Sequence, residues 1–244
     1  MKMTKNIILI GGGGLIGRAV SEDLANKNYN VIVLDKKKTK IFKNIDFFKI
    51  NIAKINSFKT LINNIFRKYN RIDCVINCSY PKGKSWGKKF LNLKEKDLRE
   101  NLYLQMGMPI IIAQIFIKKF LNQKYGNLIF FSSILGVQPP KFFHYDNTNM
   151  NSPIEYSASK AGIISMTKYL SKAFGKKNIR VNCISPGGIK TNQPKSFQRN
   201  YTKSCLTKGL LNPKDICGTV EFLISDKSKY INGQNFIIDD GWSL

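Results

Sequence analysis

A run of glycines between an apolar stretch and a helical pattern constrains the fold of this chain more than any other feature. Residues 6–10 are apolar and end at a glycine, which predicts a buried parallel strand, and residues 15–27 have helical periodicity. Between them the chain reads Gly11-Gly12-Gly13-Gly14-Leu15-Ile16-Gly17. Glycines let backbone N–H groups approach a pyrophosphate, and a helix N-terminus adds partial positive charge. Residues 11–17 are therefore predicted to bind a dinucleotide rather than to form a merely flexible turn.

The rest of the chain alternates short apolar runs with longer helical patterns. Further strands are expected at residues 31–34, 46–50, 74–77, 127–132, 180–184 and 235–238. Further helices are expected at residues 57–68, 97–120, 154–174 and 215–223. This order predicts a single-domain α/β Rossmann fold over residues 1–244, with a doubly wound, seven-stranded parallel sheet and helices on both faces.

Tyr156 and Lys160 are the main candidates for acid–base chemistry. Their spacing of four puts a phenol and an ammonium on one face of a helix, one turn apart. An ammonium beside a phenol favours the phenolate, so this pattern predicts a lowered pKa for Tyr156. Such a group can pass a proton to or from an alcohol at working pH. The alternative is that two helical residues share a face by chance.

An acid at the end of the second expected strand bears on the choice of cofactor. Asp35 follows Gly17 by eighteen positions. A carboxylate there accepts hydrogen bonds from ribose hydroxyls and repels a 2′-phosphate, which favours NAD over NADP. However, Lys36, Lys37 and Lys38 follow directly, and an ammonium could accept the 2′-phosphate of NADP. We expect NAD and keep NADP as the alternative.

The charge of the chain has two interpretations. A formal net charge of +25 is typical of a protein with an anionic partner, such as nucleic acid, a membrane surface or a phosphorylated substrate. The other interpretation is compositional drift, because the excess is mostly lysine in short, scattered groups and no arginine-rich stripe with interleaved aromatics occurs. We favour drift, and we expect no nucleic-acid or membrane partner.

Cysteine usage and hydropathy indicate a cytoplasmic protein. The five cysteines form no CxxC pair, and the single histidine, His144, is not near any of them in sequence. This predicts reduced, mostly buried thiols and no metal site. No apolar run approaches a membrane span, and the apolar stretch near the N-terminus is too short for a secretory signal.

The chain resembles the short-chain dehydrogenase/reductase family over essentially its whole length. The resemblance rests on the order of its motifs, which are the glycine loop, Asp35, Ser133, Tyr156 and Lys160. The other resembling segments are Asn77-Cys78-Ser79-Tyr80, Asn101, Ser132-Ser133-Ile134-Leu135-Gly136, Pro186-Gly187-Gly188-Ile189-Lys190-Thr191 and Tyr230-Ile231-Asn232-Gly233-Gln234.

Some residues depart from the family pattern, and they bear on cofactor preference. Ile10 replaces the usual threonine, and Leu15 replaces a glycine of the loop. Asn51 stands where an aspartate often contacts the adenine. The segment from Cys78 to Tyr80 is a poor copy of the family's N-A-G.

The resemblance implies an NAD(P)-dependent oxidoreductase that acts on CH–OH groups. In the mechanism that the resemblance implies, Ser133 hydrogen-bonds the substrate oxygen. Tyr156 is the general acid in reduction and the general base in oxidation. Lys160 lowers the pKa of Tyr156 and holds the nicotinamide ribose, and Asn101 anchors a water that joins Lys160 to solvent. The implied cofactor contacts are Gly11, Gly14, Leu15, Ile16, Gly17, Asp35, Asn51, Ile52, Asn77, Tyr156, Lys160, Pro186, Gly187, Ile189 and Thr191.

Within the family, the chain is similar to bacterial flagellin-modification protein A-like oxidoreductases over residues 77–81, 147–156 and 182–194 and at Asp239-Asp240-Gly241. This implies a small-molecule substrate, a sugar or phosphorylated sugar, in nonulosonic acid (legionaminic acid-type) biosynthesis for flagellin or surface glycans. Two alternatives stay open. One is reduction of a non-sugar carbonyl such as a 3-oxoacyl-carrier substrate, and the other is a non-catalytic cofactor sensor or nucleic-acid-binding protein that kept the fold.

Two variable segments are expected to select the substrate. Residues 137–153 separate Ser133 from Tyr156 by more than is usual in the family, and they contain Phe142, Phe143, His144 and Tyr145. These aromatics could stack on a sugar or pack beneath a surface loop. Residues 192–211 correspond to the family's substrate lid, and their basic side chains could meet a phosphate or face solvent.

The expected helix at residues 97–120 is too apolar on several sides for a lone surface helix. Family members commonly pair this helix and the Tyr156 helix between subunits. The resemblance therefore implies a homodimer or homotetramer.

Overall fold

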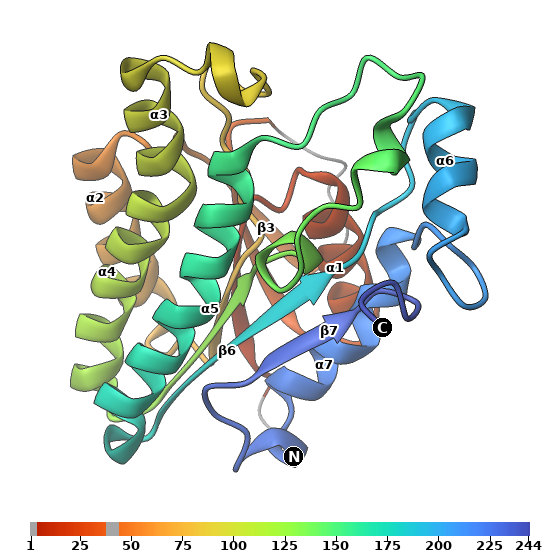
Figure 1. Ribbon diagram of the computed structural model, residues 1–244. Helices are drawn as coiled ribbons and strands as arrows, with labels where there is room; N and C mark the ends of the chain where they lie inside the picture. Colours follow the sequence, from red (N-terminus) through yellow and green to blue (C-terminus); the bar gives the residue numbers. More distant parts are fainter. Residues whose placement is uncertain (1–3, 38–43) are drawn as a thin grey trace.

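Seven parallel strands form the sheet in the computed structural model, which describes residues 4–37 and 44–244 (Figure 1). Their spatial order is β3-β2-β1-β4-β5-β6-β7. The strands are β1 Asn6–Ile10, β2 Asn30–Asp35, β3 Ile45–Lys49, β4 Cys74–Asn77, β5 Gly126–Phe131, β6 Ile179–Pro186 and β7 Asn235–Ile238. The sequence prediction of seven parallel strands is confirmed. Lys38, one of the three lysines considered for a 2′-phosphate, lies outside the described residues.

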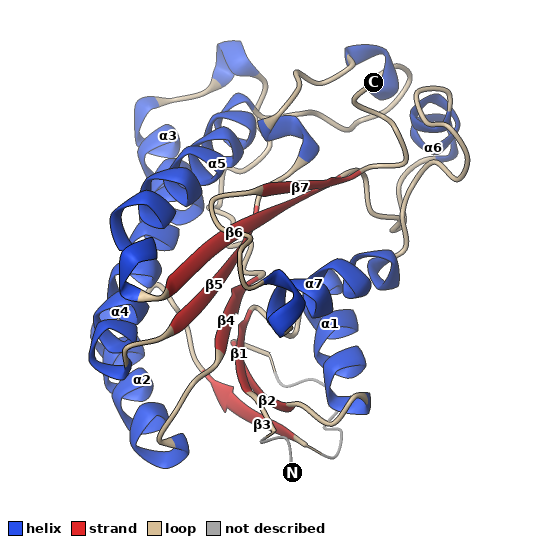
Figure 2. Cartoon of the chain, turned by 90° about the horizontal axis from the view of Figure 1, so that it is seen from below, coloured by secondary structure: helices blue, strands red, loops and turns tan. Residues whose placement is uncertain are grey.

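Helices cover both faces of the sheet, as Figure 2 shows. They are α1 Leu15–Asn26, α2 Ile55–Tyr69, α3 Glu95–Leu102, α4 Met108–Gln123, α5 Ile154–Phe174, α6 Lys195–Thr202 and α7 Cys217–Ile224. Helices α1 and α7 lie on one face, and α2, α4 and α5 lie on the other. Because both faces of the strands are covered, β1 and β4 are apolar at nearly every position rather than alternating.

Alternate side chains of each strand belong to different cores. Ile8 and Ile10 of β1 pack with Phe58 of α2 and Phe116 of α4, all of them fully buried. Ile7 and Leu9 of the same strand enter the core beneath α1 and α7. This two-sided burial fixes the register of the central strands, since a shift by one residue would exchange the two sets of side chains.

A third hydrophobic cluster lies outside these two layers. It consists of Ile134, Phe197, Tyr201, Leu210 and Trp242. These residues come from the segment after β5, from α6 and its following loop, and from the C-terminal tail. The cluster therefore joins three segments that are far apart in the sequence.

The expected helix at residues 97–120 is in fact two helices. Helix α3 ends at Leu102, a π-helical turn covers Tyr103–Gly107, and α4 begins at Met108. Periodicity did not reveal this turn, because a π-turn inserts only one extra residue per turn into an otherwise helical pattern. Helix α6 was not predicted either, because the sequence indicated only a variable lid over residues 192–211.

One segment, Glu95–Gln123, is long and apolar enough to cross a membrane by length and composition alone. Half of its most apolar window is buried inside the fold, as in the core helix of a globular protein. All five cysteines are free, and Cys74, Cys183 and Cys217 are buried, which confirms the prediction of reduced, mostly buried thiols.

Candidate active site

The carboxyl ends of the central strands bring together most of the residues singled out from the sequence. Strands β1 and β4 are neighbours, and the chain leaves them in opposite directions across the sheet. This is the topological switch point of a doubly wound sheet, where ligands bind. The glycine loop follows β1, Asn77 ends β4, and Ser133 follows β5.

The glycine loop packs tightly against the start of α1. The backbone N–H of Gly14 donates to Gly11 O at 3.1 Å. A side chain at Gly17 would collide with Gly11 O, so only glycine fits there. Gly14, at the N-cap of α1, provides no side-chain cap, which leaves the first N–H groups of the helix facing outward. The loop has the form that accepts a phosphate at a helix N-terminus.

Asp35 lies at the end of β2, next to this loop. Its carboxylate accepts hydrogen bonds from the backbone N–H of Gly13 at 2.9 Å and of Lys37 at 3.1 Å. The acid is therefore fixed beside the glycines, and its contact with a cofactor ribose stays a prediction. Lys36 and Lys37 are exposed.

The remaining predicted cofactor contacts of this half lie in turns after β3 and β4. Asn77 is buried, and its Oδ1 accepts from Ser79 N at 3.1 Å and Ser79 Oγ at 2.6 Å. Asn51 Oδ1 accepts from Ala53 N at 3.1 Å, and the neighbouring Ile52 is buried. Both asparagines thus stabilise local turns, and their contacts with a cofactor stay predictions.

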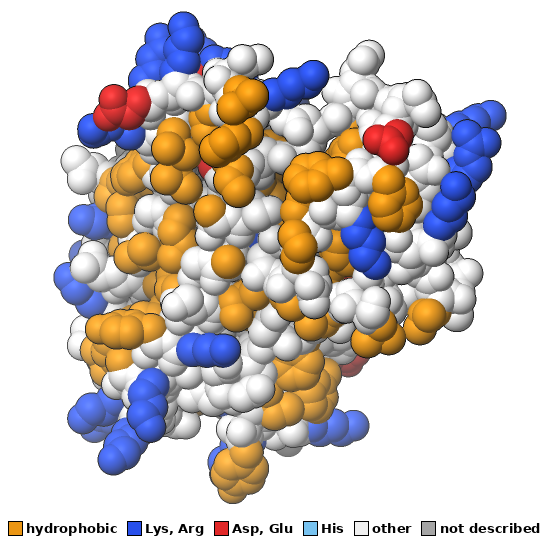
Figure 3. Space-filling view, viewed as in Figure 1, with side chains coloured by type: hydrophobic (Ala, Val, Ile, Leu, Met, Phe, Trp, Pro, Cys, Tyr) orange, Lys and Arg blue, Asp and Glu red, His pale blue; other side chains and the backbone are white. Residues whose placement is uncertain are grey.

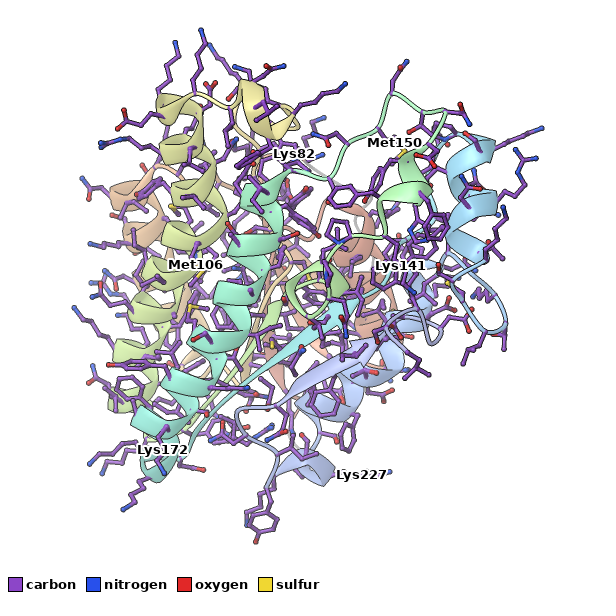
Figure 4. The ribbon with its side chains drawn as sticks, viewed as in Figure 1. Lys82, Met106, Lys141, Met150, Lys172 and Lys227 are labelled. Carbon is purple, nitrogen blue, oxygen red and sulfur yellow. The ribbon has the colours of Figure 1, made fainter. Side chains whose placement is uncertain are left out.

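The segment after β6 forms the opposite wall. Gly187 N donates to Ile238 O at 2.8 Å, which ties residues 186–191 to β7. A hollow of about 560 Å³ separates this segment from the start of α1. It is lined by Leu15, Met150, Lys190, Thr191, Asn192, Gln193 and Pro194. Leu15 and Thr191 were predicted cofactor contacts, whereas Met150 was missed; Figure 4 shows it beside α6.

Ser133, Tyr156 and Lys160 come together at the junction of β5 and α5. Ser133 is buried, and a hydrogen bond links it to the Tyr156 phenol. Lys160 is 6% exposed, and its Nζ lies 5.5 Å from the centre of the Tyr156 ring. Ser132 Oγ donates to Lys160 O at 2.7 Å, which fixes α5 against the end of β5.

The predicted lowering of the Tyr156 pKa is wrong for the protein itself. Burial raises the pKa of Tyr156 above its usual value, and the hydrogen bond with Ser133 opposes this shift. The Lys160 ammonium is directed elsewhere, because it donates to Phe131 O at 3.0 Å. Burial also lowers the pKa of Lys160 from 10.5 to about 8. Helical spacing predicted proximity correctly but could not predict burial.

Asn101 is fully buried on α3, just before the π-turn. Its Nδ2 donates to Glu155 Oε1 at 3.0 Å. Glu155 directly precedes Tyr156 and is 1% exposed. Glu155 was not predicted as a site residue, since an acid in the first turn of a helix is commonplace.

Two further aromatic rings surround the Tyr156 phenol. The ring centres of Tyr80 and Trp86 lie 5.6 and 6.0 Å from that of Tyr156, in edge-to-face arrangements. Tyr80 and Trp86 are 5.5 Å apart, and Lys82 Nζ lies 4.8 Å from the Tyr80 ring centre. Both rings come from the segment after β4, where Tyr80 departs from the family's N-A-G. That departure was the one sequence signal that could have indicated them.

The aromatics of residues 137–153 do not form one exposed wall. His144 is buried, and its Nε2 lies 2.9 Å from Ser204 Oγ. Its ring contacts Phe197, Tyr201 and Trp242 of the third cluster, and burial lowers the pKa of His144 to about 4. Phe142 and Phe143 are exposed. His144 therefore packs beneath the surface loop and does not offer its ring to a sugar, which were the two alternatives for these aromatics.

Residues 192–211, the predicted lid, are tied to the C-terminal tail. The Asp240 carboxylate accepts from Thr207 Oγ1 at 2.6 Å and from the backbone N–H groups of Thr207, Lys208 and Gly209. These hydrogen bonds, with that of Thr207 the largest cause, hold the pKa of Asp240 at about 2. Among the described residues no group of three His, Cys, Asp or Glu side chains could hold a metal ion.

Known proteins resemble this chain over nearly its whole length. A family model described as enoyl-(acyl carrier protein) reductase matches residues 14–243. Post-translational flagellin modification protein A of Campylobacter coli is 39% identical over 256 residues, covering 100% of both chains. A 3-oxoacyl-(acyl-carrier-protein) reductase of Thermotoga maritima is 26% identical over 256 residues, covering 99% of both. The crystal structure of a short chain dehydrogenase from Leptospira borgpetersenii with bound NAD+ has a TM-score of 0.91 and 29% identity, and covers 99% of this chain and 94% of its own.

A parallel sheet with a glycine loop at its switch point, and a serine, tyrosine and lysine beside it, defines a Rossmann-fold oxidoreductase. The comparisons make this specific. The chain belongs to the short-chain dehydrogenase/reductase family and is an NAD(P)-dependent oxidoreductase of that type.

Proposed function

We propose that this chain uses NAD to interconvert an alcohol and a ketone on a sugar or phosphorylated sugar, in the cytoplasm, during flagellin or surface-glycan modification. The observation that carries the proposal is the convergence of Ser133, Tyr156 and Lys160 at the carboxyl edge of the sheet. They lie at the same edge as the glycine loop.

The residues present fit a bound dinucleotide. The glycine loop leaves no room for a side chain at Gly17, and the uncapped N-terminus of α1 offers N–H groups to a pyrophosphate. The Asp35 carboxylate is held beside the loop by two backbone N–H groups, and a carboxylate there would accept from ribose hydroxyls and repel a 2′-phosphate. The nicotinamide would supply hydride transfer, and the protein would position both partners.

The chain's own residues account for the proton. Ser133 would donate a hydrogen bond to the substrate oxygen and stabilise the charge that develops there. A raised pKa keeps the Tyr156 phenol protonated near neutral pH, which suits the acid that completes reduction of a ketone to an alcohol. In the reverse direction the same oxygen would accept the proton. Buried Lys160 would orient the phenol and the nicotinamide ribose.

A sugar substrate is supported by the rings around Tyr156 and by the relative from Campylobacter coli. Tyr80 and Trp86 lie where the apolar face of a pyranose could stack while its hydroxyl reaches Tyr156. Lys82, labelled in Figure 4, has its Nζ over the Tyr80 ring, and its ammonium could bind a phosphate or carboxylate of the substrate. The 39% identical relative is named for flagellin modification.

Reduction of a 3-oxoacyl-carrier substrate is the second candidate function. It is favoured by the 3-oxoacyl-(acyl-carrier-protein) reductase among the relatives. The net charge of +25 would also suit an acidic carrier protein.

A turnover screen separates the two. Purified protein would be given NAD or NADP with nucleotide-linked and phosphorylated sugars, and the reduced cofactors with an acetoacetyl thioester. We expect turnover of a sugar with NAD and little with the thioester. Turnover of the thioester alone would support the second candidate, and a clear preference for NADPH would contradict the assignment to NAD.

The division of the molecule stays a prediction. We propose one cofactor-binding domain over residues 1–244, with residues 137–153 as a substrate loop and residues 192–211 as a lid. The contacts of His144 with Phe197 and Trp242 of the third cluster support a loop and lid that pack as one unit.

A further inference from the structure

Glu155 is a buried acid that the proposed mechanism does not use. It is the second residue of α5 and precedes Tyr156 directly. None of the ion pairs within residues 4–37 and 44–244 includes it. The partial positive charge at the start of α5 and the hydrogen bond from Asn101 Nδ2 compensate its burial. An acid kept in such a place calls for an explanation.

The other carboxylate oxygen of Glu155 and the amide oxygen of Asn101 are also buried. Glu155 Oε2 and Asn101 Oδ1 have no hydrogen-bond partner among the described residues. Each buried acceptor without a donor destabilises the folded state. An apolar pair of similar size would avoid that cost, so stability does not account for these two side chains. Their oxygens are available to a donor such as a water.

Asn101 is held from its other side by the loop after β4. A side chain at Gly83 would come within 2.5 Å of Asn101 Oδ1, so the loop backbone lies directly on the amide. The loop is fixed by the Lys88–Asp97 ion pair at 2.5 Å and by a hydrogen bond from Gln105 Nε2 to Pro81 O. Asn101 is therefore clamped between this loop and Glu155, at the end of α3.

The clamped amide is close to the reacting group. Glu155 and Tyr156 are consecutive in α5, and burial is the main cause of the raised pKa of Tyr80, with a smaller effect of the nearby Glu155. The Tyr80 ring is 5.6 Å from that of Tyr156. A change in how Glu155 holds Asn101 would thus be felt beside the phenol.

We propose that Glu155 is a positioning residue of this reaction, which fixes the Asn101 amide and with it the π-turn end of α3 beside Tyr156. The proposal rests on the proposed function, since the part of Asn101 in turnover is itself a prediction. Glu155 acts through Asn101 and does not touch the reacting atoms.

Substitutions at Glu155 test this through rescue. Glu155→Ala should lower kcat roughly 10- to 100-fold, because it removes a hydrogen bond to a charged group. Glu155→Gln should recover kcat to within about threefold of wild type, because the amide oxygen still accepts from Asn101 Nδ2. KM for the cofactor should stay unchanged in both. Glu95→Gln, an exposed first-turn acid of α3, is the matched control and should behave as wild type.

A double-mutant cycle shows whether Glu155 acts through Asn101. Glu155→Ala combined with Asn101→Ala should be no slower than Asn101→Ala alone. If Glu155→Ala does not fold, the donor and the acceptor of this hydrogen bond can be exchanged. Asn101→Asp alone should be slow, because two carboxylates then face each other. Adding Glu155→Gln should restore turnover, because the amide at 155 can donate to the carboxylate at 101.

Several results would overturn the proposal. They are wild-type kcat in Glu155→Ala, a Glu155→Gln variant as slow as Glu155→Ala, additive losses in the cycle, or an exchanged pair that stays slow. Failure of the proposed function has a different signature, because the wild type itself would then turn over no alcohol or ketone.

Discussion

Burial, more than charge pairing, sets the ionisation of the two residues on which the proposed chemistry depends. Lys160 is almost completely enclosed and gives its hydrogen bond to Phe131 O rather than to a carboxylate. Its ammonium is therefore expensive to keep in the folded state. Such a lysine is a burden on stability that an oxidoreductase tolerates at its active site.

The buried ammonium predicts a pH dependence of stability. The folded protein releases the Lys160 proton near pH 8, whereas the unfolded chain keeps it to about 10.5. Between these values the unfolded state binds more protons at this group, so the contribution of Lys160 to stability rises with pH, by roughly 3 kcal/mol over the window. Lys160→Met should lose this rise and be inactive. Urea unfolding from pH 7 to pH 10 measures it.

Lys168→Met is the control for this prediction. Lys168 is an exposed lysine two turns further along α5, and its replacement should leave the rise intact. Equal slopes for wild type and Lys160→Met would show that the ammonium is not buried as described.

Among individual residues, the sequence predicted those that belong to motifs with a characteristic spacing. Ser133, Tyr156 and Lys160 could be found because they belong to one strand end and one helix. Glu155, Trp86 and Met150 could not, because their roles depend on segments that approach only in the folded chain. The Tyr156 pKa was mispredicted for the same reason, since spacing along a helix does not show burial.

The loop after β4 is the element that brings new groups to the site. It carries Tyr80, Lys82 and Trp86, and Asn151 Nδ2 ties it to the predicted substrate loop, residues 137–153, through Gly87 O at 3.2 Å and Lys88 O at 3.0 Å. From the sequence, the start of this loop, Cys78 to Tyr80, was interpreted only as a poor copy of the family's N-A-G. The loop's length and lysines gave no sign that it would return to the Tyr156 helix.

Trp86 is expected to contribute to substrate affinity. Trp86→Ala should raise KM for the substrate about tenfold, because a stacking surface is worth about 1 kcal/mol beyond its buried area. Trp86→Phe should retain most of the affinity. Steady-state kinetics with the substrate found in the turnover screen would measure both.

Phe90→Ala is the matched control, since Phe90 is an aromatic of the same loop that is 70% exposed. It should leave KM unchanged. An unchanged KM in Trp86→Ala would assign Trp86 to packing around Tyr156 alone.

The whole molecule presents an apolar face that a second copy could cover. Figure 3 shows hydrophobic side chains gathered over the α4–α5 side, and Tyr103, Ile110, Ile154 and Tyr169 are exposed there. Between them α5 exposes small residues at Ala158, Ala161 and Ser165, which would let another helix approach closely. This supports the expected homodimer or homotetramer.

Ala161→Arg should therefore lower the oligomeric state, because it places a charge in the middle of the proposed helix contact. Light scattering of wild type and variant measures the change. Ser57→Arg, at an exposed position of α2, should leave the mass of the oligomer unchanged. A wild type that is monomeric at the outset would contradict the interface.

The fold as a whole was the most predictable level. The seven parallel strands and the helices on both faces follow from apolar runs, the glycine loop and the alternation of strands with helices. The parts that were missed, the π-turn at Tyr103–Gly107 and helix α6, depend on how α3 and the lid pack rather than on local pattern.

The central claim is that the Tyr156 phenol transfers the proton in a hydride-transfer reaction. Tyr156→Phe tests it most directly, with cofactor binding measured beside turnover and Tyr169→Phe, an exposed tyrosine of the same helix, as control. We predict a fall in kcat of about 1,000-fold or more, with cofactor Kd within about threefold of wild type. Turnover within about tenfold of wild type would contradict the assignment of Tyr156 as the acid–base group.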